Sequence, residues 1–353
     1  MTPLAFLVPG ALDQVTGGYL FDRKIVEGLR RTGREVAVVE LAGAYPGADD
    51  VAREAIAAAF AALPASSAAV IDGLALPGAE RCLVEAASRL RLVGFIHHPL
   101  ALETGLTAAE QAHFAALEAR LLPLLSGAIC PSAETARALV GYGLGGARIA
   151  IVPPGTAKPD APAQRRGTRG RKRLLCVATV TPRKGHRLLI EALADLADLD
   201  WELLCIGSLE RDPAEAEALR RAIAHHGLAS RVALAGEWPP ERLGAAYQAA
   251  DAFVLPSFLE GYGMAFAEAL AHGLPIVATR GGAIPDTVPE TAGLLVAPGD
   301  ATALAAALRR LLTEEGLRER LAAGAARAGV LLPDWDEAVR SWAAAFDRLV
   351  GEK

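Results

Sequence analysis

Short apolar runs rich in Val, Ile and Leu recur along the chain, and each is followed by a longer segment with apolar residues at helical spacing. Because the runs are apolar throughout, they indicate strands buried on both faces, as in parallel sheets covered by helices. Two sets of six runs predict an α/β protein with two doubly wound, Rossmann-like domains. The expected strands are 4–10, 36–41, 68–74, 92–98, 127–132 and 149–155, followed by 174–180, 201–207, 231–237, 252–257, 275–282 and 293–299.

The domain boundary is predicted where this pattern stops. Between residues 156 and 173, helical and strand periodicity both end, and Pro, Gly and Arg dominate. We therefore predict an N-terminal domain over 1–155, a linker over 156–173 and a C-terminal domain over 174–332. The last segment, 333–353, predicts an amphipathic helix with an apolar stripe at spacings of three and four, which indicates packing rather than chemistry. That stripe consists of Trp335, Val339, Trp342 and Phe346.

Composition narrows the class of protein. A length of 353 residues suits two domains, and a formal net charge of −5 gives no reason to expect a nucleic acid partner. The first ten residues lack the pattern of a secretory signal, and no run of 18 apolar residues occurs. The cysteines are far apart and form no CxxC pair, so we interpret them as reduced residues of a cytoplasmic protein. They are Cys82, Cys130, Cys176 and Cys205.

The end of the predicted linker is basic. Six of the nine residues from 165 to 173 are Lys or Arg. This cluster suits an anionic surface, so a peripheral contact with the inner face of a membrane is one interpretation. A solvated hinge that leads into a strand is the simpler one.

Candidate chemistry is expected at the carboxyl ends of the strands, where open parallel sheets bind ligands. After the first strand, Gly17 and Gly18 open a helix, and glycines there allow backbone amides to approach an anion. His97 and His98 follow the fourth strand, and only one of two adjacent side chains is expected to face a ligand. A structural role for these residues remains open. Metal binding would need further ligands at suitable spacing, and the pattern of histidines shows none.

In the second half, Arg183 and Lys184 lie in the turn after the strand 174–180. Two cations at the mouth of a parallel sheet suit a diphosphate, because fixed positive charges and amide donors hold an anion better than water does. An exposed basic turn without a ligand is the alternative.

The stretch EGYGMAFAE places Glu260 and Glu268 at either side of a glycine-bearing turn and the start of a helix. The two acids could form a catalytic pair, a metal site or the two ends of a ligand site. Their separation of about 10 Å along a helix favours the third arrangement. A metal would require more oxygen ligands. The helix N-terminus between them carries free amides and partial positive charge, which favours phosphate oxygens.

Taken together, these residues resemble the retaining, nucleotide-sugar-dependent glycosyltransferases of family four, also called glycosyl transferases group 1. The strongest part of the resemblance is Glu260 to Glu268, the E-x7-E motif of that family, and the likeness extends over nearly the whole chain. It implies the GT-B architecture, in which two Rossmann-like domains face each other across a cleft. It also implies that the helix in 333–353 packs back on the N-terminal domain.

The resemblance assigns a role to each matching residue. Glu268 would bind the ribose, Lys184 and nearby helix amides the diphosphate, and Glu260 the donor sugar, while His97 would lie near the reacting face of the sugar. The implied catalytic residues are therefore His97, Lys184 and Glu260. The implied substrate-binding residues are Gly17, Gly18, Arg183, Gly261, Tyr262, Gly263, Met264, Ala265 and Glu268.

Two positions depart from the family pattern. Thr179 stands where many members carry an arginine, so Arg183 would have to supply the second diphosphate cation. Asp286 stands where a glutamate is common.

We therefore predict a hexosyltransferase that uses a UDP- or GDP-linked sugar and a hydroxyl acceptor, with retention by front-side substitution and without cofactor or metal. The acceptor could be a glycan, a lipid or a small molecule, and the sequence leaves the oligomeric state open. A nucleotide-sugar 2-epimerase or a non-catalytic partner subunit with the same fold is the alternative. A nicotinamide dehydrogenase would need the glycine fingerprint GxGxxG, which the chain lacks.

Overall fold

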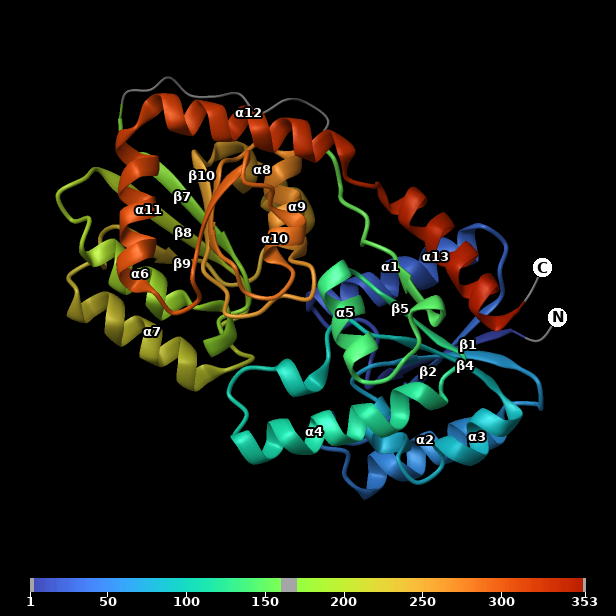
Figure 1. Cartoon of the computed structure of the whole chain (residues 1–353). Helices are drawn as coiled ribbons and strands as arrows, with labels where there is room; N and C mark the ends of the chain where they lie inside the picture. The colour runs from blue at the N-terminus through green and yellow to red at the C-terminus, as the bar shows by residue number, and fades with distance from the viewer. Residues whose placement is uncertain (1–2, 160–169, 352–353) are drawn as a thin grey trace. The chain divides into compact units, whose positions relative to one another are not determined.

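The computed structural model describes residues 3–159 and 170–351 (Figure 1). The chain forms two compact units, each with its own sheet. Unit 1 consists of Met1–Gly155 together with Pro333–Lys353, and unit 2 consists of Thr156–Leu332. Most of the predicted linker, and half of its basic cluster, fall within 160–169 and so lie outside the described residues.

The sheet of unit 1 has six strands in the order β2-β1-β3-β4-β5-β6, and all neighbouring pairs are parallel. Because β1 and β3 are neighbours while β2 lies outside β1, the direction of winding reverses between β1 and β3. The strands are β1 (Leu4–Pro9), β2 (Val36–Leu41), β3 (Ala68–Asp72), β4 (Arg91–Phe95), β5 (Gly127–Cys130) and β6 (Ile149–Ile151).

Helices cover both faces of this sheet. Figure 1 shows α1 and α13 on one face and α2, α3 and α4 on the other. Separate apolar clusters fill the two faces, and Trp342, which is fully buried, belongs to the cluster beneath α1 and α13. The helices are α1 (Gly17–Arg31), α2 (Asp50–Ala62), α3 (Leu83–Arg89), α4 (Ala108–Leu121), α5 (Ala133–Gly141) and α13 (Trp335–Val350).

Unit 2 repeats the plan, with the strand order β12-β11-β10-β7-β8-β9 and parallel pairing throughout. Here the winding reverses between β7 and β10. The strands are β7 (Lys172–Val177), β8 (Trp201–Ile206), β9 (Val232–Leu234), β10 (Ala252–Leu255), β11 (Ile276–Thr279) and β12 (Gly293–Val296).

The helices of unit 2 also lie on both faces of its sheet. Figure 1 shows α6, α7 and α11 on one face and α8, α9 and α10 on the other, while α12 packs against α9. One apolar cluster connects both faces, and its members all lie between 174 and 332. The helices are α6 (His186–Ala194), α7 (Pro213–His225), α8 (Pro240–Ala249), α9 (Met264–Ala271), α10 (Ile284–Thr287), α11 (Ala301–Thr313) and α12 (Glu315–Leu331).

The predicted fold class is confirmed, since all twelve expected strands are present and form two doubly wound parallel sheets. One boundary was wrong. The predicted linker ended at residue 173, but β7 begins at Lys172, because Lys172 and Arg173 pair with Trp201 and Glu202 on the neighbouring strand. Within the described part of the chain, every helix is too short or too polar to cross a membrane.

Candidate functional site

In unit 2, the loops that follow β7, β10 and β11 are bound to one another at the point where the winding reverses. The Arg183 carbonyl accepts a hydrogen bond from the Phe258 amide at 2.7 Å, and the Arg183 guanidinium donates to the Leu259 carbonyl at 2.8 Å. On the other side, the Ala283 amide donates to the Glu260 carbonyl at 2.8 Å. Ligands of open parallel sheets bind at such reversal points, so this is where a ligand is expected.

The centre of this cluster is a buried ion pair. Lys184 Nζ donates to both carboxylate oxygens of Glu260, at 2.7 and 2.9 Å, and the Arg183 guanidinium lies 3.5 Å from the same carboxylate. The Ser257 hydroxyl donates a further hydrogen bond to Glu260 Oε1 at 2.6 Å. Glu260 is 6% exposed. The carboxylate is therefore held by two cations and a hydroxyl group in a largely dry setting.

The charge state of Glu260 follows from these neighbours. Burial raises the pKa of its carboxyl group, but the charges of Lys184 and then Arg183 outweigh burial and hold that pKa below its usual value. Glu260 is thus ionised at neutral pH. With two cations against one carboxylate, the cluster keeps an excess positive charge that can bind an anion.

The helix α9 begins beside this cluster and starts at a glycine. Gly263 is the N-cap residue, with φ +89° and ψ 63°, and no side chain caps the helix. A β-carbon at this left-handed position would also press on the ring of Phe266, so only glycine fits. The first turn of α9 therefore presents amide groups at its N-terminus without a competing side-chain acceptor.

Glu268 lies on α9 and has a different partner. Its carboxylate accepts a hydrogen bond from the Tyr247 hydroxyl at 2.8 Å, and the Tyr247 ring stacks on His272 with 5.0 Å between ring centres. Burial raises the pKa of Glu268, and the bond from Tyr247 opposes that rise. Glu260 and Glu268 thus belong to separate hydrogen-bonded groups, as expected for two ends of a ligand site rather than an acid–base pair.

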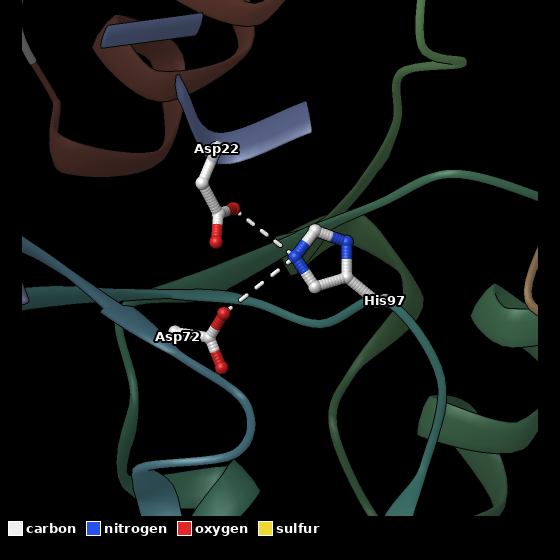
Figure 2. Close-up of side chains that lie close together, drawn as sticks. All are labelled: Asp22, Asp72 and His97. Carbon is white, nitrogen blue, oxygen red and sulfur yellow. Dashed lines mark hydrogen bonds and ion pairs between the residues drawn. The ribbon is translucent and has the colours of Figure 1, made fainter. Parts of the chain in front are cut away.

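Unit 1 contains a second polar cluster, also at the reversal point of its sheet (Figure 2). His97 Nε2 lies 3.0 Å from Asp22 Oδ1 on α1 and 3.6 Å from Asp72 Oδ2 at the end of β3. Figure 2 shows both carboxylates directed at the same ring nitrogen. The donor atoms of the three residues lie within 4.8 Å of one another, a spacing that could also hold a metal ion.

Packing fixes the ring of His97 in place. The ring of Phe95 lies 4.8 Å from it and the ring of Phe21 5.9 Å, measured between ring centres. A β-carbon at Gly18 would lie only 3.2 Å from the imidazole, so a residue without a side chain allows the ring and α1 to approach. His97 keeps 18% of its side chain exposed, whereas Asp22 is fully buried.

The three ionisable groups influence one another strongly. Burial raises the pKa of Asp22 to about 7, against the opposing charge of His97. Burial lowers the pKa of His97, but the charges and hydrogen bonds of Asp22 and Asp72 reverse this and raise it to about 10. The carboxylate neighbours favour a protonated imidazole, because the geometry places both acids at one nitrogen.

The predicted residues fall into two groups. Arg183, Lys184, Glu260 and the turn Gly261–Gly263 lie in the unit 2 cluster, with Met264 and Ala265 in the first turn of α9 and Glu268 one turn later. In unit 1, Gly17 begins α1, and Gly18 lies against His97. His98 is bound instead to Glu103 at 3.1 Å. Asp286 is exposed on α10.

The polar residues that surround these groups were not predicted from the sequence. They are Asp22, Asp72, Tyr247 and Ser257. Asp72 and Ser257 carried a usable signal, because Asp72 lies near the end of the predicted strand 68–74 and Ser257 ends the predicted strand 252–257. Asp22 and Tyr247 lie inside helices and carried none.

Unit 2 also contains a cavity of about 590 Å³ between α8 and the first halves of β7, β8 and β9. It is mainly apolar and includes Trp238, whose ring stacks on the Arg242 guanidinium at 3.6 Å. None of the predicted site residues lines it. Because it lies away from the carboxyl ends of the strands, we do not assign the site to it.

Comparison with known proteins identifies the class of domain. Residues 158–328 match the family model described as Glycosyl transferases group 1. A D-inositol 3-phosphate glycosyltransferase from Xylanimonas cellulosilytica is 36% identical over 213 residues, which cover 56% of this chain and 50% of that protein. The chain spans about half the length of the curated relatives it matches. Over residues 158–328, the family resemblance seen in the sequence is confirmed.

Solved structures extend the likeness to the whole fold. A sucrose-phosphate synthase from Thermosynechococcus elongatus aligns over 100% of both chains, with a TM-score of 0.81 and 22% identity. Anabaena HepE in complex with UDP and glucose covers 98% of this chain and 99% of its own, with a TM-score of 0.73 and 18% identity. The fold is that of GT-B glycosyltransferases.

Proposed function

We propose that this chain, whose residues 158–328 belong to the glycosyl transferases group 1 family, is a retaining glycosyltransferase. In this proposal it transfers a hexose from a UDP- or GDP-linked sugar to a hydroxyl acceptor, without a metal ion. Unit 2 binds the donor, while unit 1 binds the acceptor and contributes His97.

The observation that carries the proposal is the cluster of Lys184 and Arg183, both partly buried, around the buried Glu260 beside the start of α9. A diphosphate would bind the two cations and the α9 amides, since all of these donors favour anionic oxygens. Once Lys184 binds a phosphate oxygen, the Glu260 carboxylate gains a free lone pair for a sugar hydroxyl. In this proposal one cluster thus binds both groups that the breaking bond joins, the diphosphate and the sugar.

Glu268 and Tyr247 suit the ribose of the donor. A carboxylate can accept hydrogen bonds from two neighbouring hydroxyls, and the Tyr247 hydroxyl fixes the orientation of this one. The solved structure of HepE with UDP and glucose supports a uridine nucleotide as the first donor to test. The glycine cap at Gly263 lets phosphate oxygens approach the helix N-terminus closely.

The proposed step is a front-side substitution. The bond between the acceptor oxygen and the anomeric carbon forms on the face from which the bond to the diphosphate oxygen breaks. The acceptor hydroxyl gives its proton to the departing phosphate oxygen. Negative charge grows on the diphosphate during the step, and Lys184, Arg183 and the α9 amides stabilise it electrostatically.

The acceptor is the less defined part of the proposal. A relative is named for D-inositol 3-phosphate, so a phosphorylated polyol is the first acceptor class that we propose to test. Free sugars and lipid-linked hydroxyls form the second and third classes.

The proposal is tested by binding and turnover in the full chain. We expect UDP or GDP to bind and Lys184→Ala and Glu268→Ala each to weaken nucleotide binding by roughly tenfold or more, as expected for loss of a charged hydrogen bond. Calorimetric titration measures the affinity. Glu319→Ala, which removes an exposed carboxylate from α12, is the matched control. Unchanged affinity in both site variants would refute the donor assignment.

Turnover assays separate the alternative functions. We expect a transferred sugar with the anomeric configuration of the donor and unchanged rates in the presence of EDTA. Formation of a C2-inverted sugar from donor alone would identify an epimerase. A folded chain that binds no nucleotide and transfers no sugar would identify a non-catalytic subunit, and reduction of NAD a dehydrogenase.

A further inference from the structure

The cluster in unit 1 places two carboxylates at His97, although one carboxylate would be enough to orient the ring. Asp22 and Asp72 come from different elements, α1 and the end of β3, yet both face Nε2 of His97. Asp72 is itself fixed, because its Oδ1 accepts the Leu74 amide at 2.6 Å. The side chains of the two acids are 0% and 2% exposed. Two carboxylates are thus buried against one imidazole.

One oxygen of this cluster has no partner. Asp22 Oδ2 is buried and lacks a hydrogen bond within the described ranges 3–159 and 170–351. Figure 2 shows this carboxylate and that of Asp72 on the same side of the His97 ring, both beside one ring nitrogen. Buried carboxylates are costly unless a positive charge lies close, and among the described residues the His97 imidazole is the group that forms an ion pair with these two acids.

We propose that Asp22 and Asp72 are positioning residues that keep His97 as an imidazolium with its Nε2 proton shared between them. His97 then acts as a fixed positive hydrogen-bond donor and not as a general base. The inference rests on the proposed transfer function, because it defines what His97 contributes to that reaction. The raised pKa of His97 agrees with this protonated state.

The shape of the cluster determines which atom remains for a ligand. With Nε2 directed at the acids and the ring held by Phe21 and Phe95, Nδ1 is the nitrogen left to donate. In an imidazolium Nδ1 carries a proton, so its partner must be an oxygen acceptor such as a hydroxyl or phosphate oxygen. A cation that cannot accept the acceptor's proton also agrees with proton transfer to the departing phosphate.

The His97 ring is packed against side chains from α1, β3 and β4. In the part of the chain that the structure describes, the charged groups that face the ring are Asp22 from α1 and Asp72 from the end of β3. Phe21 from α1 and Phe95 from β4 are neutral, and the ring of Trp335 on α13 packs against Phe21.

The decisive experiment records the ring nitrogens of His97 by ¹⁵N NMR in the full chain, with His97→Gln to assign the signals. We expect both nitrogens to be protonated from pH 6 to 8. In Asp22→Asn, which keeps the shape of the side chain, the titration midpoint should fall by at least one pH unit. Glu103→Gln removes the matching partner of His98 and is the control, since it should leave His97 unchanged.

Kinetics provide the functional readout. We expect Asp22→Asn to lower kcat on the order of tenfold, with the donor KM nearly unchanged, because an electrostatic donor is weakened without loss of the donor site. The rate of this variant should fall further as pH rises through the new titration of His97, while the wild type stays flat. Asp22→Glu, which restores the charge, should recover part of the rate.

Three outcomes would overturn the inference. The first is a neutral His97 in the wild type at pH 7. The second is a titration that Asp22→Asn leaves unchanged. The third is a shift of the His97 signals by equimolar Zn²⁺ or Mn²⁺ that EDTA reverses, which would identify a metal site instead. If His97 is an imidazolium but the chain binds no donor and transfers no sugar, the proposed function fails and the charge assignment stands.

Discussion

At the level of single residues, the pair of Lys184 and Glu260 determines which groups a ligand of unit 2 must offer. In the free protein, each satisfies the charge of the other at 2.7 Å, so neither is an unpaired buried charge. A diphosphate can replace Glu260 as the partner of Lys184, and a sugar hydroxyl can replace Lys184 as a partner of Glu260. Ligand binding thus replaces the hydrogen bonds between Lys184 and Glu260 with hydrogen bonds to the ligand, and neither residue loses its partner.

His186 gives a prediction about stability and pH. It opens α6, is 1% exposed, and neither ring nitrogen has a hydrogen bond among the described residues. Burial, followed by the charge of Lys184, lowers its pKa from 6.5 to about 4. Because the unfolded chain binds this proton first, protonation of His186 costs little stability above pH 6.5 and lowers the stability as pH falls toward 4. The loss at pH 5 is about 2 kcal/mol.

His186→Leu should remove that loss. We expect the variant to be more stable than the wild type by about 1 kcal/mol at pH 7.5, because an unpaired buried polar group is replaced by an apolar one. The difference should widen at pH 5. Urea denaturation at both pH values measures it, and His225→Gln, at an exposed position on α7, is the control. An equal gap at the two pH values would contradict the prediction.

Sequence alone identified the residues of the site that belong to local patterns. Lys184 lies in a basic turn after a strand, and Glu260 and Glu268 flank a helix start, so short stretches sufficed. Asp22 and Tyr247 meet their partners across 75 and 21 positions of the chain, through contacts that depend on tertiary packing. Neither their neighbours in sequence nor their residue type distinguishes them from ordinary helix residues.

At the level of elements, the contact between α1 and α13 depends on a glycine. A β-carbon at Gly28 would overlap the side chain of Val339, and the branched Val339 has little rotational freedom in a helix. Gly28→Ala improves helix propensity by about 1 kcal/mol, but we expect the overlap to prevail. The net result should be a destabilisation of about 1–3 kcal/mol, measured by thermal or urea denaturation.

Two further variants separate packing from propensity. Gly244 lies in α8 with open space around it, so Gly244→Ala should stabilise the protein by up to about 1 kcal/mol. In the double variant Gly28→Ala/Val339→Ala, the smaller residue on α13 should relieve part of the damage caused by Gly28→Ala. If Gly28→Ala behaves like Gly244→Ala, the two helices do not meet at this glycine.

The elements themselves were largely predictable. Strands buried on both faces give continuous apolar runs that end at turn residues, and the amphipathic stripe of α13 matched the helix Trp335–Val350. The start of β7 was misplaced because Lys172 and Arg173 are polar, and only their pairing with β8 makes them strand residues. Apolar periodicity reports burial, whereas a strand end made of polar residues is determined by hydrogen bonds to the neighbouring strand.

At the level of the whole molecule, the two cores are built from different parts of the chain. The apolar cluster of unit 2 contains only residues from 174 to 332, a continuous segment. The core of unit 1 beneath α1 needs α13 from the far end of the chain, since Val339, Trp342 and Phe346 belong to it. Unit 2 can therefore complete its core without the rest of the chain, but unit 1 cannot complete its own before α13 is present.

This difference predicts that the segment Thr156–Leu332, produced alone, folds and keeps the donor site, because a domain with its own continuous core can fold independently. We expect cooperative urea unfolding and nucleotide affinity within about tenfold of the full chain, with affinity reduced by Lys184→Ala in both contexts. The segment Met1–Gly155 without α13 should instead aggregate or lack a cooperative transition, because the apolar face beneath α13 is exposed. An isolated unit 2 that unfolds without cooperativity, or that binds no nucleotide although the full chain does, would show that its core or its site needs unit 1.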